Sequence, residues 1–219
     1  MEFSYTITSN PDIPSVIHRG KYSAPIWIQQ KWKDGEYAEY IRKNGCGHCC
    51  TAMCLNLFGI KIDPHEEFTL CRKMWGEPRN EEPICEDNFA SASGVVKVIK
   101  SFGIKAEAFG VPTGKYMECA VHIENSLRSG KLVIFWSSPS EKLNHNPFSP
   151  GEHYVLAVGL TKDSKIIIAN STDRCDAENG IQYTDTKTIG LSLREGCDPQ
   201  DFTWGRYDLD HSGGYVVIG

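Results

Sequence analysis

Three residues far apart in the sequence could together carry thiol chemistry: Cys46, His153 and Asn170. Cys46 lies in the stretch Asn-Gly-Cys-Gly-His-Cys-Cys, directly before a run with helical periodicity. His153 begins one apolar run, and Asn170 ends the next. A thiol, an imidazole and a side-chain amide are the groups of a nucleophile, a general base and a residue that orients the base. The pattern therefore predicts attack of a cysteine sulfur on a carbonyl group.

A helix is predicted to begin close to Cys46. After it, apolar side chains recur three and four residues apart, at Cys50, Met53, Cys54, Leu57 and Phe58. Asn44 can cap the N-terminus of this helix, and Gly59 stands where a left-handed C-terminal residue is expected. A cysteine in the first turn lies at the positive end of the helix dipole, which favours the thiolate. An ion pair with His153 would act in the same direction, so we expect Cys46 to be the most reactive of the nine cysteines.

Two predicted β-strands bring His153 and Asn170 together. The runs His153–Leu160 and Ser164–Asn170 are separated by a short polar segment, which predicts an antiparallel hairpin. A histidine at the start of one strand then lies beside an asparagine at the end of its neighbour. In that position the amide can hold the imidazole in one tautomer while the other ring nitrogen faces the thiol.

Helical patterns dominate the first half of the chain and β patterns the second. Residues 10–25 are rich in proline and glycine and predict an irregular arm, and 26–33 predicts a short strand or turn. Further elements are predicted at Val95–Phe102 and Tyr116–Leu127 (helices) and at Ile104–Phe109, Leu132–Trp136, Ile166–Ala169 and Tyr215–Ile218 (strands), with polar loops at 76–86 and 137–152. This order predicts an α+β fold in one domain over 1–219, with a helical part at about 26–130 and a β-rich part at about 131–219.

Composition excludes some classes of function. With 23 basic and 28 acidic residues the net charge is −5, and no basic run offers a nucleic-acid surface. No apolar stretch approaches the length of a bilayer span. The N-terminus lacks the pattern of a signal peptide, and the nine cysteines cluster rather than spread. We therefore expect a cytoplasmic protein, unless a signal peptide has already been removed.

The chemistry-bearing residues also carry a family resemblance. Asn-Gly-Cys-Gly before Met-Cys-Leu-Asn-Leu-Phe-Gly resembles the nucleophile helix of papain-like cysteine peptidases, above all the bacterial branch that includes the bacteriocin-leader-processing peptidases. Gly-Glu-His153-Tyr-Val and the strand that ends in Asn170 resemble the same branch. The resemblance implies a two-lobe fold in which a nucleophile helix packs on an antiparallel sheet. It implies Cys46 as nucleophile, His153 as base and Asn170 as orienting residue, although the family often has Asp there.

Further expectations follow from that resemblance. A glutamine upstream of the nucleophile would complete the oxyanion hole, and Gln29 and Gln30 are the candidates. The substrate would be a peptide or amide, with no metal or organic cofactor required, and the oligomeric state stays open. Many members continue after Gly-Cys-Gly with proline and small hydroxyl residues, whereas this chain has His48-Cys49-Cys50. This departure bears on substrate preference.

Other interpretations of the same residues stay open. Cys46 could be a buried structural cysteine, His153 a hydrogen-bonded residue at a strand end, and Asn170 a turn former. A papain-like module without catalysis could bind a peptide in the same cleft. Cys46-Gly-His-Cys49 resembles, over four residues, the redox motif of protein disulfide isomerases, but the segment before it is polar where a strand is required. A zinc site would combine Cys46, His48 and Cys49 with Cys119 or His122.

Overall fold

The computed structural model describes residues 3–8, 14–75, 92–140, 143–173, 179–195 and 214–219. The strands are β1 (Phe3–Thr6), β2 (Val16–Arg19), β3 (Tyr22–Pro25), β4 (Ala106–Phe109), β5 (Leu132–Ser137), β6 (His153–Leu160), β7 (Ile166–Ala169), β8 (Ile181–Thr184) and β9 (Tyr215–Ile218). The helices are the 3-10 helix η1 (Gln29–Lys31) and the α-helices α1 (Ala38–Asn44), α2 (Cys46–Asn56), α3 (Pro64–Trp75), α5 (Ala92–Ser101), α6 (Tyr116–Arg128) and α7 (Thr186–Ser192). Helices combined with antiparallel sheets confirm the predicted α+β class.

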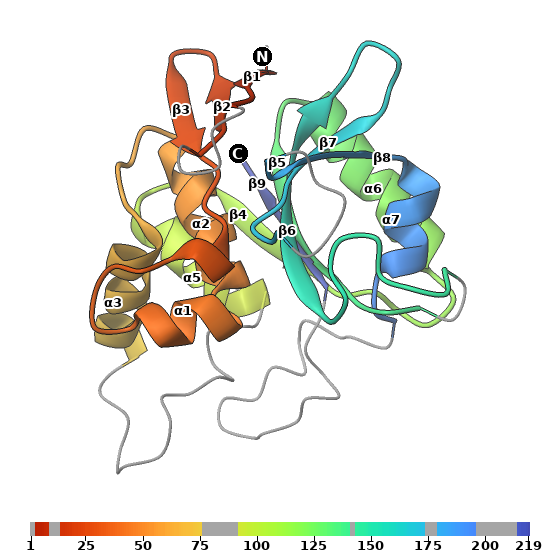
Figure 1. Ribbon diagram of the computed structural model, residues 1–219. Coiled ribbons are helices and arrows are strands. Elements are labelled where there is room, and N and C mark those ends of the chain that lie inside the picture. Colours follow the sequence, from red (N-terminus) through yellow and green to blue (C-terminus); the bar gives the residue numbers. More distant parts are fainter. Residues whose placement is uncertain (1–2, 9–13, 76–91, 141–142, 174–178, 196–213) are drawn as a thin grey trace.

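The chain forms two lobes that meet at a sheet. Figure 1 shows α1, α2 and α3 with the β2–β3 hairpin on the left, and the strands β5 to β8 with α6 and α7 on the right. Within the described ranges, the larger sheet has six antiparallel strands in the order β4-β9-β5-β6-β7-β8. No helix in these ranges combines the length and the apolar character that crossing a bilayer requires.

Helices cover both faces of the six-stranded sheet. One face shares a core with α2 and α5, and the other shares a core with α6 and α7. Because both faces are covered, β5, β6 and β7 are buried almost from end to end and consist of continuous apolar runs. The predicted strands at 132–136, 153–160, 166–169 and 215–218 are confirmed. Helix α6, placed by the sequence in the helical part, packs on this sheet.

Helix α2 is buried on all sides. Residues from Gly47 to Leu55 are all buried because the helix packs between the sheet, the β2–β3 hairpin, α3 and α5. The predicted helix is thus confirmed, and Gly59 adopts the left-handed conformation with φ +88. The prediction that Asn44 caps α2 is wrong, because Asn44 is the last residue of α1. Gly45 joins the two helices, and a Cβ there would lie 2.4 Å from the carbonyl oxygen of Ile41.

The predicted irregular arm at 10–25 is also wrong in its described part. Strands β2 and β3 lie within it and form a three-stranded antiparallel sheet with β1. Pro14 precedes β2, Pro25 ends β3, and Gly20 turns between the two strands with φ +58, so these residues bound the strands without interrupting their pairing. Residues 26–33 contain η1.

The other predicted elements have mixed outcomes. The helices at 95–102 and 116–127 are confirmed as α5 and α6, and the strand at 104–109 as β4. The predicted loop at 76–86 lies outside the described residues. Helices α1, α3 and α7 and strand β8 were not predicted. The single-domain organisation stays a prediction.

Candidate active site

His153 and Asn170 lie side by side, as the hairpin predicts. Strands β6 and β7 are antiparallel neighbours, so the first residue of β6 comes close to the residue that follows β7. The Nε2 atom of His153 lies 2.9 Å from the Oδ1 atom of Asn170. Both side chains are buried. Because an amide oxygen can only accept, the contact is a hydrogen bond when Nε2 carries the ring proton.

Cys46 is the first residue of α2, at the end of the helix that contacts β6. In the next turn, the Sγ atom of Cys50 donates a hydrogen bond to the carbonyl oxygen of Tyr154 at 3.4 Å. A Cβ at Gly47 would lie 3.3 Å from the ring of Tyr154, so the absence of a side chain there permits the close approach. The first turn of α2 therefore rests on β6 directly beside His153.

Burial affects the protonation of the Cys46 thiol. Burial raises the pKa of the Cys46 thiol above its ordinary value, and hydrogen bonds from backbone N–H groups, first that of Tyr154, oppose this effect only in part. Burial therefore opposes the thiolate that the position at the start of the helix favours, and the predicted thiolate stays a prediction. Among the six cysteines that the structure describes, Cys46 alone keeps partial exposure.

Gln29 contacts both the segment that follows Asn170 and the segment that precedes Cys46. Its side chain is 5% exposed, and its backbone N–H donates to the carbonyl oxygen of Ser171 at 2.8 Å, directly after Asn170. Its Nε2 atom faces the carbonyl oxygens of Arg42 and Lys43 at 3.4 and 3.5 Å, in the last turn of α1. Its Oε1 atom is buried and has no hydrogen-bond partner among the described residues. A buried acceptor without a donor costs about 1–3 kcal/mol, which makes this an unusual position for a purely structural glutamine.

Gln30 is engaged differently. It is half-buried, and its Oε1 atom accepts a hydrogen bond from the backbone N–H of Asp173 at 3.3 Å. Both glutamines therefore contact the segment that follows Asn170, but Gln29 also reaches the chain just before Cys46. The oxyanion role of either residue stays a prediction.

A buried polar network lies behind the nucleophile. The Nδ1 atom of His48 is 2.6 Å from the Oε2 atom of Glu67, and the Sγ atom of Cys71 donates to Oε1 of the same carboxyl at 3.3 Å. Burial raises the pKa of Glu67, and His48 opposes that shift. The rings of Tyr40 and Phe68 pack against the imidazole. Sequence reasoning missed Glu67, because a glutamate in the first turn of a helix usually stays in solvent.

The predicted zinc ligands do not come together. His122 Nδ1 lies 2.8 Å from the hydroxyl of Tyr215, and Cys119 Sγ faces the carbonyl oxygen of Gly110, both on α6 across the sheet from α2. Among the described residues, the one group of three possible metal ligands within 4.8 Å of one another is His48, Glu67 and Cys71. Within this group, the imidazole of His48 and the thiol of Cys71 each contact one oxygen of the Glu67 carboxyl.

The redox interpretation also lacks its structural context. A helix, α1, precedes Cys46, where a thioredoxin-like site would have a strand. Cys49 is fully buried, and burial raises its pKa well above the ordinary value. His48 and Cys50 are buried as well. The departure from the family pattern at 48–50 therefore concerns the packing of α2 and not a surface that substrate could reach.

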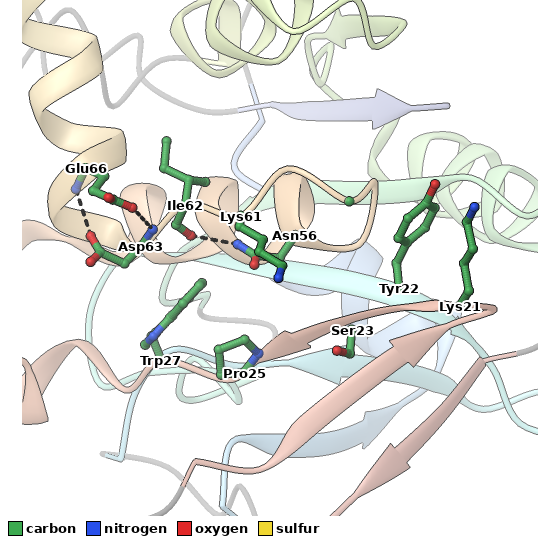
Figure 2. A pocket seen from close by; sticks show the side chains of 11 residues that line it. Lys21, Tyr22, Ser23, Pro25, Trp27, Asn56, Lys61, Ile62, Asp63 and Glu66 are labelled. Carbon is green, nitrogen blue, oxygen red and sulfur yellow. Dashed lines mark hydrogen bonds between the residues drawn. The ribbon is translucent and has the colours of Figure 1, made fainter.

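A pocket of about 650 Å³ lies elsewhere on the molecule. Figure 2 shows it between the β2–β3 hairpin and the C-terminal end of α2, with Trp27 and Asn56 among its lining residues. Asp63 and Glu66 accept hydrogen bonds from each other's backbone N–H groups at 2.8 and 3.0 Å, so their carboxylates cap α3. The lining contains none of the predicted site residues, and its Asn56 lies about 15 Å along α2 from Cys46.

Comparison with known proteins identifies the family. A family model described as "Peptidase_C39 like family" matches residues 24–191, a range that includes Gln29, Cys46, His153 and Asn170. The chain belongs to this family. Membership confirms the resemblance to the bacteriocin-processing branch of the papain-like peptidases and supports a cysteine peptidase function.

Three solved structures resemble the chain at low identity. The peptidase domain of Streptococcus ComA, a bifunctional ABC transporter involved in quorum sensing, is 9% identical, with a TM-score of 0.43 over 81% of this chain and 92% of that one. A double glycine motif protease from an AMS/PCAT transporter, in complex with the leader peptide, is 13% identical, with a TM-score of 0.43 over 98% and 97%. A C39-like peptidase from Bacillus anthracis is 14% identical, with a TM-score of 0.47 over 99% and 98%. No curated protein matches the chain.

Proposed function

We propose that the protein hydrolyses a peptide or amide bond, with Cys46 as nucleophile, His153 as general base and Asn170 as the residue that orients the base. The observation that carries this proposal is the hydrogen bond between His153 and Asn170. The next residue, Tyr154, is the one that the first turns of α2 contact. Membership of the Peptidase_C39 like family supports the class of reaction.

The proposed first step is proton transfer coupled to attack. Because Asn170 engages Nε2 of His153, Nδ1 is the ring nitrogen that takes the thiol proton. Burial raises the pKa of Cys46 and so favours the protonated thiol, and we propose that the base takes this proton as substrate binds. The sulfur then attacks the carbonyl carbon, and an electron pair of the C=O bond moves to the oxygen.

The resulting oxyanion needs hydrogen-bond donors. The first backbone N–H groups of a helix have no acceptor within that helix, so the N–H of Cys46 is one proposed donor. The second is Nε2 of Gln29, in preference to Gln30, because its contacts with Arg42 and Lys43 are long and hence readily exchanged. His153 then returns its proton to the leaving amine, and water hydrolyses the thioester with the same residue as base.

Mutation of the nucleophile tests the proposal. The wild-type protein is incubated with a defined peptide library, and products are identified by mass spectrometry. Cys46→Ala should abolish cleavage, whereas Cys54→Ala, a change at a fully buried thiol two turns further along α2, should keep it. Cleavage that survives in Cys46→Ala would refute the nucleophile. Peptide binding without any cleavage by the wild type would favour the non-catalytic module instead.

A further inference from the structure

The amide of Asn170 is held on three sides. Its Oδ1 atom faces His153, and its Nδ2 atom donates to the carbonyl oxygen of Phe148 at 2.9 Å and to Oε1 of Gln182 at 3.2 Å. The carbonyl oxygen of Phe148 can only accept, so nitrogen and not oxygen of the amide must face it. The amide oxygen is thereby directed at the histidine ring.

The orientation of the Gln182 amide is fixed by a similar hydrogen bond. It lies on β8 and is paired with Ile168 of β7, two residues before Asn170. Its Nε2 atom donates to the carbonyl oxygen of Pro147 at 2.8 Å. Because this carbonyl also accepts only, the Oε1 atom of Gln182 must face Asn170. Two consecutive carbonyls of the loop before β6, those of Pro147 and Phe148, therefore determine the orientation of both amides.

We propose that Gln182 is a positioning residue for the candidate active site: it locks the amide of Asn170 and thereby fixes the tautomer of His153. This inference rests on the proposed function of that site. Since the locked oxygen can accept but not donate, the neutral ring carries its proton on Nε2 and its lone pair on Nδ1. That lone pair is the one required to take the proton of Cys46.

The same contacts select asparagine over aspartate at position 170. A carboxylate would place its second oxygen against the carbonyl oxygen of Phe148 and against Oε1 of Gln182, at the distances where Nδ2 now donates. Rotation of the Gln182 amide would relieve one of these contacts, but it would turn oxygen toward the carbonyl of Pro147. No arrangement of these groups satisfies a carboxylate, because the surrounding acceptors require a donor.

The test is Gln182→Met, which keeps the length of the side chain but removes both polar atoms. Nitrogen NMR of histidine-labelled protein reports the tautomer of His153, and p-nitrophenyl acetate reports turnover by Cys46. The wild-type ring should be protonated at Nε2. In Gln182→Met we expect a mixture of tautomers and a kcat lower by about tenfold with KM unchanged, because an orienting group and not a binding group is lost. Tyr183→Phe, on the exposed side of the same strand, should change neither.

Each outcome decides the point. A wild-type ring protonated at Nδ1, or a Gln182→Met variant with unchanged tautomer and kcat, would overturn the role of Gln182. If Gln182→Met does not fold, Gln182→Leu removes the same polar atoms with a more compact side chain and should give the same mixture of tautomers; the wild-type tautomer in that variant overturns the role as well. If the wild type shows no Cys46-dependent turnover, the proposed function is refuted. A changed tautomer of His153 in Gln182→Met would still support the positioning role in that case.

Discussion

The Nδ1 atom of His48, two residues after Cys46, lies 2.6 Å from the Oε2 atom of Glu67 in the interface between α2 and α3. Both side chains are almost completely excluded from solvent, at 2% and 0% exposed. A buried carboxyl without a partner is costly, and here the imidazole and the thiol of Cys71 occupy its two oxygens. The pair therefore ties the start of the nucleophile helix to its neighbour.

Removal of the carboxyl should destabilise the fold. Glu67→Ala leaves the His48 ring buried without its partner, so we expect the free energy of unfolding to fall by about 3–5 kcal/mol in urea denaturation. Glu67→Gln should cost less, because its amide oxygen can still accept from the ring. The control is Glu39→Ala, which breaks an exposed pair with Lys43 and should have no measurable effect. Equal stability of Glu67→Ala and wild type would contradict a structural role for the pair.

Alkylation by iodoacetamide should single out Cys46 and should be slow at neutral pH. Burial raises the pKa of this thiol, so the reactive thiolate fraction is small at pH 7 and grows as the pH rises. Burial raises the pKa of Cys54 to about 12, and that thiol should stay unlabelled over the same range. Peptide mapping at several pH values measures both rates. Rapid, pH-independent labelling of Cys46 from pH 6 to 8 would show that an ion pair forms in the free protein after all.

Cys49 should be dispensable for catalysis. It is fully buried, packs with Trp32 and Ile41, and burial raises its pKa well above the ordinary value, so it has no accessible thiolate to resolve a disulfide. Cys49→Ala should therefore retain most hydrolysis of an activated ester, whereas Cys46→Ser should lose it. A requirement for both cysteines, together with reduction of a model disulfide, would favour the oxidoreductase.

The sequence predicts the pairing of His153 with Asn170 because a hairpin places the start of one strand beside the end of the next. The partners of Asn170 could not be predicted in this way. Gln182 is a polar residue in a four-residue strand, and its role depends on the backbone carbonyls of Pro147 and Phe148 in a distant loop. The rise in the pKa of Cys46 could not be predicted for a similar reason, because desolvation depends on tertiary packing.

On the N-terminal side of the site, tertiary packing outweighed two local sequence preferences. Asn44 is a favourable N-cap, but α1 continues through it and a glycine makes the joint to α2. The prolines near 14 and 25 suggested an irregular arm, yet they stand at the boundaries of paired strands. In both cases the residue type was compatible with two structures, and packing against α2 selected one.

The last prediction compares the base with the residue that orients it. His153→Ala removes the proposed base, and turnover should fall by about a thousandfold or more, whereas Asn170→Ala should cost about 10- to 100-fold, because an imidazole without its partner still adopts the productive pose part of the time. Asn170→Ala also leaves the carbonyl of Phe148 and the Oε1 atom of Gln182 without their donor, so we expect it to lower the free energy of unfolding as well, by about 1–3 kcal/mol.

Rates must therefore be measured well below the unfolding temperature of each variant, with matched circular dichroism spectra. Asn170→Asp separates the two effects, because it preserves the shape of the side chain and supplies an acceptor to His153. If orientation of the ring were all that mattered, this variant would match the wild type. The buried acceptors around position 170 instead require a donor, so we expect Asn170→Asp to lose both stability and turnover. A fully active Asn170→Asp variant would show that these acceptors rearrange, and an active His153→Ala variant would remove this histidine from the mechanism.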